Sequence, residues 1–141
     1  MARTFTIVKP DSVAAGNTGN ILAHLEKEGF KLLGIKMLRL TEAQAHGFYE
    51  VHAARPFFPD LVKFMTSGPV VVAALERDGD AVTHLRSVMG ATDSKKADAG
   101  TVRNLYGTDI ERNAIHGSDS DENAAREIAF FFSASKLLGN A

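Results

Sequence analysis

The sequence contains no cysteine. This absence excludes a disulfide framework, a thiolate nucleophile and cysteine-ligated zinc or iron–sulfur centres, and it fits a reducing compartment. No run of about 18 consecutive apolar residues is present, so the sequence predicts no membrane-spanning helix. The first residues hold too short an apolar run for a signal peptide. We therefore expect a soluble, cytoplasmic protein.

A strong charge of either sign is also lacking. The 16 Lys and Arg residues nearly balance the 17 Asp and Glu residues, leaving a net charge of −1. The composition therefore predicts no broad basic surface for a nucleic-acid backbone, and we expect no specific nucleic-acid partner. An anion that binds here should be small. The 141 residues predict a single domain spanning 1–141, long enough to bury a sizeable core.

Neither common glycine-rich phosphate signature occurs, whether Gly-x4-Gly-Lys-Ser/Thr or Gly-x-Gly-x-x-Gly after a strand. A phosphate site would therefore have to be built from side chains. The candidates are cationic or polar and mostly fall at the ends of predicted elements or in a long polar loop: Lys9, Arg86, Thr92, Arg103 and Asn113. Arg86 and Arg103 could equally be solvated surface charges, so the composition leaves both interpretations open.

Hydrophobic periodicity predicts four strands and five helices. The strands are predicted at 3–9, ending at Pro10, and at 31–40, 70–75 and 115–118. The helices are predicted from Gly19 to a cap at Gly29, from a capping box at Thr41 to about 49–51, around 61–65 and over 78–89. A last helix is marked by apolar residues over 124–132, and Asp119 and Ser120 are predicted to start it. Residues 11–18 and 91–113 are predicted as loops.

This order of elements predicts an α/β sandwich of the ferredoxin-like type, with helices packed on a four-stranded antiparallel sheet and one inserted helical hairpin. The continuous apolar run of 70–75 is typical of a strand covered on both faces, so it should lie centrally. The short segment 115–118 should be an edge strand. The loop before it is long for a compact domain, which indicates a functional or disordered segment.

His116 is the candidate nucleophile. An imidazole has an unperturbed pKa near ~6.5, so at neutral pH a ring nitrogen usually offers a free lone pair. A histidine near Gly and Ser is also common in ordinary loops, and His116 alone does not decide between these interpretations. Glu127 on the last helix could orient Ser118 or the His116 ring, or could be a solvated helix residue.

Aromatic residues near Tyr49 and Phe57 could stack a nucleotide base. Phe58 is more easily explained as packing the hairpin onto the sheet, and it need not share the environment of Phe57.

With these residues in hand, the chain resembles the nucleoside diphosphate kinase family over essentially its whole length. The family signature Asn-x-x-His-Gly-Ser-Asp stands here as Asn113-Ala114-Ile115-His116-Gly117-Ser118-Asp119. The other matching segments are Thr6-Ile7-Val8-Lys9-Pro10-Asp11, Phe48-Tyr49, Arg55-Pro56-Phe57-Phe58, Gly90-Ala91-Thr92, Gly100-Thr101-Val102-Arg103 and Ala124-Ala125-Arg126-Glu127-Ile128.

The resemblance implies a ping-pong phosphotransferase in which His116 takes the terminal phosphoryl group of a nucleoside triphosphate and passes it to a nucleoside diphosphate. Mg2+ would bridge the phosphates, without a metal site of the protein's own. The implied roles are phosphate contacts from Arg86, Thr92 and Arg103, a position beside His116 for Tyr49, sugar contacts from Lys9 and Asn113, and base stacking on Phe57, with Leu61 and Ile110 nearby. Lys9 would also approach the transferred group.

Stacking on an apolar face uses no base-edge hydrogen bond. The resemblance therefore also implies tolerance of purine and pyrimidine bases and of ribose and deoxyribose sugars.

Family members are homo-oligomers built from a common dimer. The sequence does not choose among dimer, tetramer and hexamer, although the small and weakly charged segment 133–138 favours an assembly larger than a dimer, such as a tetramer.

One position departs from the family pattern, because Ser94 stands where most members have proline. Serine there restores backbone freedom, so we expect lower stability than in a Ser94→Pro variant.

Two other readings remain. One is a ferredoxin-like regulatory module that binds nucleotides without catalysis, and the other is a histidine phosphocarrier that docks to another protein. Retention of His116 disfavours the first, because binding alone requires no nucleophile. A large apolar surface beside His116 would favour the second.

Overall fold

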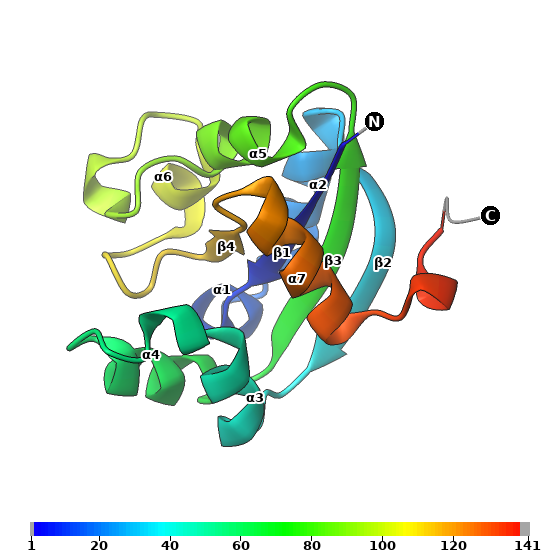
Figure 1. Cartoon of the computed structure of the whole chain (residues 1–141). Helices are drawn as coiled ribbons and strands as arrows, with labels where there is room; N and C mark the ends of the chain where they lie inside the picture. Colours follow the sequence, from blue (N-terminus) through cyan, green and yellow to red (C-terminus); the bar gives the residue numbers. More distant parts are fainter. Residues whose placement is uncertain (1, 139–141) are drawn as a thin grey trace.

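A computed structural model describes residues 2–138 and shows one four-stranded antiparallel sheet with helices on it (Figure 1). The strands are β1 (Ala2–Val8), β2 (Lys31–Leu38), β3 (Val70–Arg77) and β4 (Ile115–Gly117), in the order β2-β3-β1-β4. All three pairings are antiparallel. The predicted fold class is confirmed, as are the interior place of β3 and the edge place of β4.

Two hydrophobic clusters cover the two faces of the sheet, because successive strand residues point to opposite sides. On one face Phe5 and Ile7 of β1 pack with residues of α3 (Glu42–Phe48), α4 (Phe58–Met65) and α7 (Asp121–Phe131). On the other face Val71 and Leu75 of β3 pack with residues of α2 (Thr18–Lys27) and α5 (Ala81–Met89). The sheet is therefore covered on both sides, which explains the apolar run in β3.

The predicted helical hairpin is present between β2 and β3. Thr41 caps α3 by accepting from the Gln44 amide, and the Gln44 side chain accepts in return from the Thr41 amide. This capping box was predicted from the sequence. After α3 the chain makes a single turn of 3₁₀-helix, η1 (Glu50–His52), before α4. The hairpin carries aromatic residues to one end of β1 and β4.

The two predicted loops were partly wrong. Residues 11–18 contain the short helix α1 (Pro10–Ala14), where Pro10 occupies the first helical position and needs no hydrogen-bond partner for its nitrogen. The segment 91–113 contains the 3₁₀ turn η2 (Ser94–Lys96) and the helix α6 (Val102–Tyr106), which Thr101 caps through the Asn104 amide. Helices of five residues have too few positions to show a periodic pattern.

Several boundaries differ from the predictions. Helix α5 begins at Ala81 rather than at 78, because Asp80 takes the cap position and accepts from the Thr83 amide. Strand β2 ends at Leu38, two residues early. Helix α7 starts after Ser120, as predicted, with the Ser120 hydroxyl accepting from the Asn123 amide, and a last 3₁₀ turn, η3 (Ala134–Lys136), follows it.

Replacing Ser94 with proline is expected to stabilise the protein by less than about 1 kcal/mol. Ser94 is the first residue of η2, a position suited to proline, but its buried hydroxyl also donates to the Asp109 carbonyl at 3.1 Å. Loss of that bond costs about 0.5 kcal/mol, at the lower end of the usual range, and offsets part of an entropy gain of up to about 1 kcal/mol. Ser94→Ala should therefore be less stable than wild type. Thermal denaturation of the three proteins tests this, and no gain for Ser94→Pro over wild type would contradict it.

Candidate active site

His116 lies on β4, opposite Ile7 of β1, and its side chain is 20% exposed. Aromatic rings enclose the imidazole edge-on, with the ring centroids of Phe48 and Tyr49 at 5.4 Å and 6.0 Å. The β4 pairing and these rings restrict how the imidazole can turn. One part of the ring remains open to a cavity, so a small molecule can reach it.

A carboxylate selects the tautomer of the neutral His116 ring. Nε2 lies 2.8 Å from Oε1 of the buried Glu127, and the Ser118 hydroxyl donates to the same oxygen at 2.8 Å. Because a carboxylate only accepts hydrogen bonds, Nε2 carries the proton and Nδ1 keeps its lone pair. Glu127 therefore contacts both groups that the sequence had left as alternatives.

A cavity of about 400 Å³ opens beside His116. Phe57 lies at its edge and is about half exposed, whereas its neighbour Phe58 is buried in the core. The cavity brings together residues from the exit of β1, the hairpin, the 91–113 segment and β4: Lys9, Tyr49, His52, Phe57, Leu61, Thr92, Arg103, Ile110, Glu111, Asn113 and His116. Residues that lie more than 100 positions apart in the sequence therefore line the same cavity.

Lys9 is the buried cation of this cavity. Its ammonium donates to Oδ1 of Asn113 at 2.7 Å. Burial, and secondly the nearby Arg103 guanidinium, lower the pKa of Lys9 to about 8. An anion in the cavity would counteract both effects, because its negative charge would favour the charged ammonium and raise the pKa of Lys9.

Arg103 is also buried, and two backbone carbonyls fix it. Nη1 donates to the Gly90 carbonyl at 3.1 Å, and Nη2 donates to the Ile115 carbonyl at 2.9 Å. Burial, together with the charge of Arg86, lowers the pKa of Arg103 to about 10. The guanidinium is thus held in place before any ligand binds.

Asn113 has both ends of its amide engaged. Nδ2 donates to the carbonyls of Thr92 and Ile110, and Oδ1 accepts from Lys9. An amide oxygen has two lone pairs, so Oδ1 can accept one further bond. A ligand hydroxyl is a suitable donor for it.

A second cavity of about 320 Å³ continues from the first. The two share Tyr49, His52, Thr92, Arg103 and His116, and the second adds the exposed Arg86 together with Asp119, Asn123, Arg126 and Glu127. The Tyr49 hydroxyl is buried without a hydrogen-bond partner within residues 2–138. Burial, and secondly the Glu127 carboxylate, raise the pKa of that hydroxyl.

The sequence prediction omitted some lining residues. His52 borders both cavities, and its ring lies near that of Phe57, with centroids 5.6 Å apart. Its spacing of three from Tyr49 is a helical signal that could have revealed it. Glu111 had no comparable signal. All the predicted site residues border these two cavities except Ser118, which reaches the site through Glu127.

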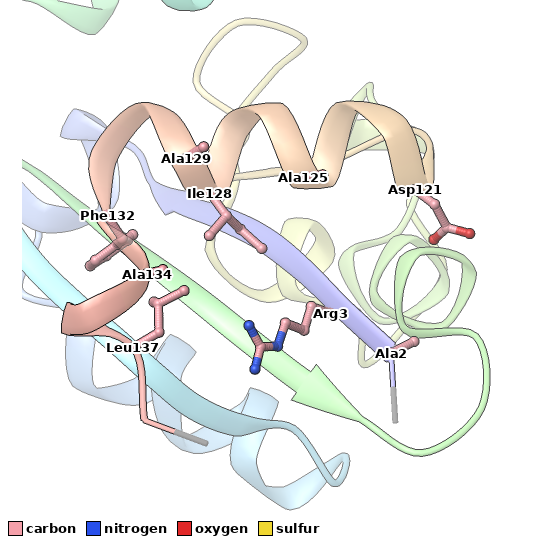
Figure 2. Close-up of a pocket in the computed structure, with 9 residues that line it drawn as sticks. All are labelled: Ala2, Arg3, Asp121, Ala125, Ile128, Ala129, Phe132, Ala134 and Leu137. Carbon is pink, nitrogen blue, oxygen red and sulfur yellow. The ribbon is translucent and has the colours of Figure 1, made fainter. Parts of the chain in front are cut away.

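A third hollow, of about 480 Å³, lies between α7, the start of β1 and the segment after α7 (Figure 2). It is the largest of the three cavities, yet its walls are mostly alanine and larger apolar side chains. Arg3 and Asp121 are the only charged residues that line it. We place the candidate site at His116 because the cations and the imidazole meet there.

Residues 2–138 contain no cluster of three or more His, Cys, Asp or Glu side chains placed to hold a metal ion. Within the same range, every helix is too short or too polar to span a bilayer.

Comparison with known proteins agrees with this geometry. A model of the family described as "Nucleoside diphosphate kinase" matches residues 2–137. The chain belongs to the nucleoside diphosphate kinase family. A nucleoside diphosphate kinase from Anaeromyxobacter sp. (strain K) is 56% identical over 92% of this chain and 88% of its own length. The enzyme of Desulfosudis oleivorans is 51% identical over 99% of both chains.

Solved structures of nucleoside diphosphate kinases share the fold. The Aquifex aeolicus enzyme superposes with a TM-score of 0.94 at 46% identity, covering 97% of this chain and 99% of that one. The Halobacterium salinarum enzyme in complex with CDP gives a TM-score of 0.91 at 45% identity, covering 96% and 90%. Members of the family transfer phosphoryl groups between nucleotides and generally use a divalent metal.

Proposed function

We propose that this protein, as a single domain spanning 1–141, transfers the terminal phosphoryl group between nucleotides through a phosphohistidine at His116. The observation that carries the proposal is the bond between Nε2 and Glu127, which leaves the Nδ1 lone pair free for attack. Nδ1 bonds to the γ-phosphorus while the bond to the β–γ bridging oxygen breaks, and the diphosphate leaves with those electrons. A second nucleoside diphosphate reverses the step.

Cations around His116 suit a phosphoryl group in transfer. Its equatorial oxygens carry dispersed negative charge, so catalysis is mostly positioning and electrostatic stabilisation. Lys9 and Arg103 provide fixed, buried charges, and Arg86 provides an exposed one. Thr92 lines both cavities and adds a hydroxyl for a phosphate oxygen.

Magnesium fits this site as a companion of the nucleotide. The second cavity, where the phosphates would lie, is lined by Arg86, Arg103 and Arg126. Such cationic donors suit phosphate oxygens rather than the direct ligation of a metal ion. Mg2+ would accordingly be held by phosphate oxygens and water, where it neutralises charge on the leaving diphosphate. The nucleotide-bound ion would then be oriented indirectly, because the phosphates would be fixed by Lys9, Arg86 and Arg103.

The apolar end of the first cavity suits a base. Phe57 offers a half-exposed ring, with Leu61 and Ile110 in the same lining. Such contacts use no base-edge hydrogen bond, which supports tolerance of different bases. The free lone pair of Asn113 Oδ1 and the neighbouring Lys9 suit sugar hydroxyls.

Homo-oligomers built from dimers, with a tetramer among the possible sizes, and a cytoplasmic location are part of the same proposal. They rest on the family resemblance and the sequence composition.

The decisive experiment is labelling with γ-labelled ATP. We expect base-stable, acid-labile label on His116, at Nδ1, and its complete discharge by GDP. Peptide mapping identifies the residue, and phosphohistidine isomer analysis identifies the atom. Label that remains on the protein after GDP addition would overturn the ping-pong mechanism.

The titration of Lys9 should give activity and stability opposite pH dependences. The ammonium is needed in its charged form, so kcat/KM should fall as pH rises through about 8, the lowered pKa of Lys9. In the unfolded chain the same pKa is near ~10.4, so the folded state loses the proton first and stability should rise between about pH 8 and 10.

The measurements are the pH profile of kcat/KM and denaturant unfolding over the same range. Lys9→Met, which has no ammonium, should lack both changes. A wild-type kcat/KM that stays level to pH 10 would contradict the assignment.

A further inference from the structure

The chain makes a strained turn two residues before His116. The Ile115 amide donates to the Asn113 carbonyl at 2.9 Å, which closes a three-residue γ-turn around Ala114. Ala114 has φ +74° and is the one non-glycine residue with positive φ within 2–138. Turns of this type are rare and strained, and the surrounding structure must hold them.

Two groups in the segment 9–11, a carboxylate and a backbone amide, form hydrogen bonds to this turn. The Asp11 carboxylate accepts from the Ala114 amide through Oδ2 at 3.1 Å, and the Lys9 amide donates to the Ala114 carbonyl at 2.9 Å. Pro10 lies between them and fixes its own φ as the first residue of α1. Both peptide groups of the fully buried Ala114 are therefore bound to the exit of β1.

The turn connects two residues of the site. Asn113 precedes it and binds Lys9, and His116 follows it on β4. Because one residue reverses the chain here, a change in the Ala114 backbone would move the Asn113 amide and the His116 ring relative to each other. Asp11 itself lines neither cavity, so it can affect the reaction through the backbone of the turn or through its negative charge, which raises the pKa of Lys9. Asp11→Asn separates the two routes, because asparagine keeps the acceptor oxygen and lacks the charge.

We propose that Asp11 is a positioning residue for phosphoryl transfer, because its carboxylate holds the strained turn that places Asn113 and His116 at one site. This inference rests on the proposed function. The interaction requires only an acceptor oxygen at Oδ2, within reach of the Ala114 amide. An asparagine can provide that oxygen, whereas an alanine cannot.

Single-turnover phosphorylation of His116 by ATP tests the proposal. Asp11→Ala should slow it by about 10- to 100-fold, the range seen when groups that orient active-site ligands are removed. Asp11→Asn should stay within about threefold of wild type, because its amide oxygen accepts the same bond. Should Asp11→Ala fail to fold, Asp11→Ser takes its place, since its hydroxyl stops one bond short of the amide.

The Ala114→Gly variant distinguishes an effect of Asp11 on the position of the turn from an effect on the stability of the whole protein. Glycine adopts positive φ without strain, so in this background Asp11→Ala should slow phosphorylation by less than about threefold. Asp80→Ala is the matched control, because Asp80 makes the same kind of bond to the Thr83 amide on α5. It should lower the stability without slowing phosphorylation.

An unchanged rate in Asp11→Ala would overturn the inference, as would equal slowing with alanine or glycine at 114, or equal slowing in Asp80→Ala. Wild-type protein that takes no label would instead overturn the proposed function, and the inference with it.

Discussion

Replacing His116 with alanine is expected to abolish nucleotide phosphotransfer, with a fall in kcat of at least about 10⁴-fold, as for other covalent nucleophiles. Without the His116 imidazole, the cavity loses the nucleophile that Glu127 orients and that is proposed to carry the phosphoryl group between the two half-reactions. The neighbouring cations remain, so nucleotide binding should persist. Steady-state assays with ATP and GDP measure the first effect, and calorimetric titration with ADP measures the second.

The matched control is His24→Ala. His24 lies on α2 and lines neither cavity, so its removal should leave the labelling of the protein unchanged. The His116 ring packs against Phe48 and Tyr49, and thermal denaturation should therefore accompany the assays. Labelling by γ-labelled ATP in a folded His116→Ala protein would assign the phosphate to another residue.

Patterns that repeat over many residues predicted most of the fold. The apolar run at 70–75 predicted the interior strand β3, and the capping box at Thr41 predicted the start of α3. The two five-residue helices, α1 and α6, were missed because a single turn gives almost no periodicity and depends on its caps and packing. A sequence predicts an element well when the preferences of many residues agree. It predicts an element poorly when a single contact determines whether that element forms.

The candidate site also has features that the sequence predicted and features that it could not predict. The residues came from a resemblance to family motifs, since charge and spacing alone left Arg86 and Arg103 as possible surface residues. In the structure Arg86 is exposed and Arg103 is buried. The bond from Lys9 to Asn113 joins residues 104 positions apart, and the bond from Arg103 to the Ile115 carbonyl crosses the loop between α6 and β4. They depend on the packed positions of several elements, and no local pattern encodes them.

This difference in burial means that two arginines of one site should respond differently to the same substitution. Arg103 holds the carbonyls of Gly90 and Ile115, on either side of the long loop, and it also faces the phosphate space. Arg86 lines the same cavity and makes no hydrogen bond to the backbone within residues 2–138. Arg103 is thus tied to the fold as well as to the proposed site, whereas Arg86 faces the proposed site without such backbone contacts.

Arg103→Lys is expected to lower kcat/KM by about 10²- to 10³-fold, since an ammonium cannot reproduce a fork that stabilises developing charge. It should also lower the free energy of unfolding by about 1–3 kcal/mol, because at least one buried carbonyl loses its donor. Arg86→Lys is the matched control and should reduce kcat/KM with a stability change within about 0.5 kcal/mol, as for other exposed positions. Denaturant unfolding and steady-state kinetics on both variants measure these effects. Equal losses of stability in the two would show that the buried carbonyl contacts of Arg103 contribute nothing to the fold.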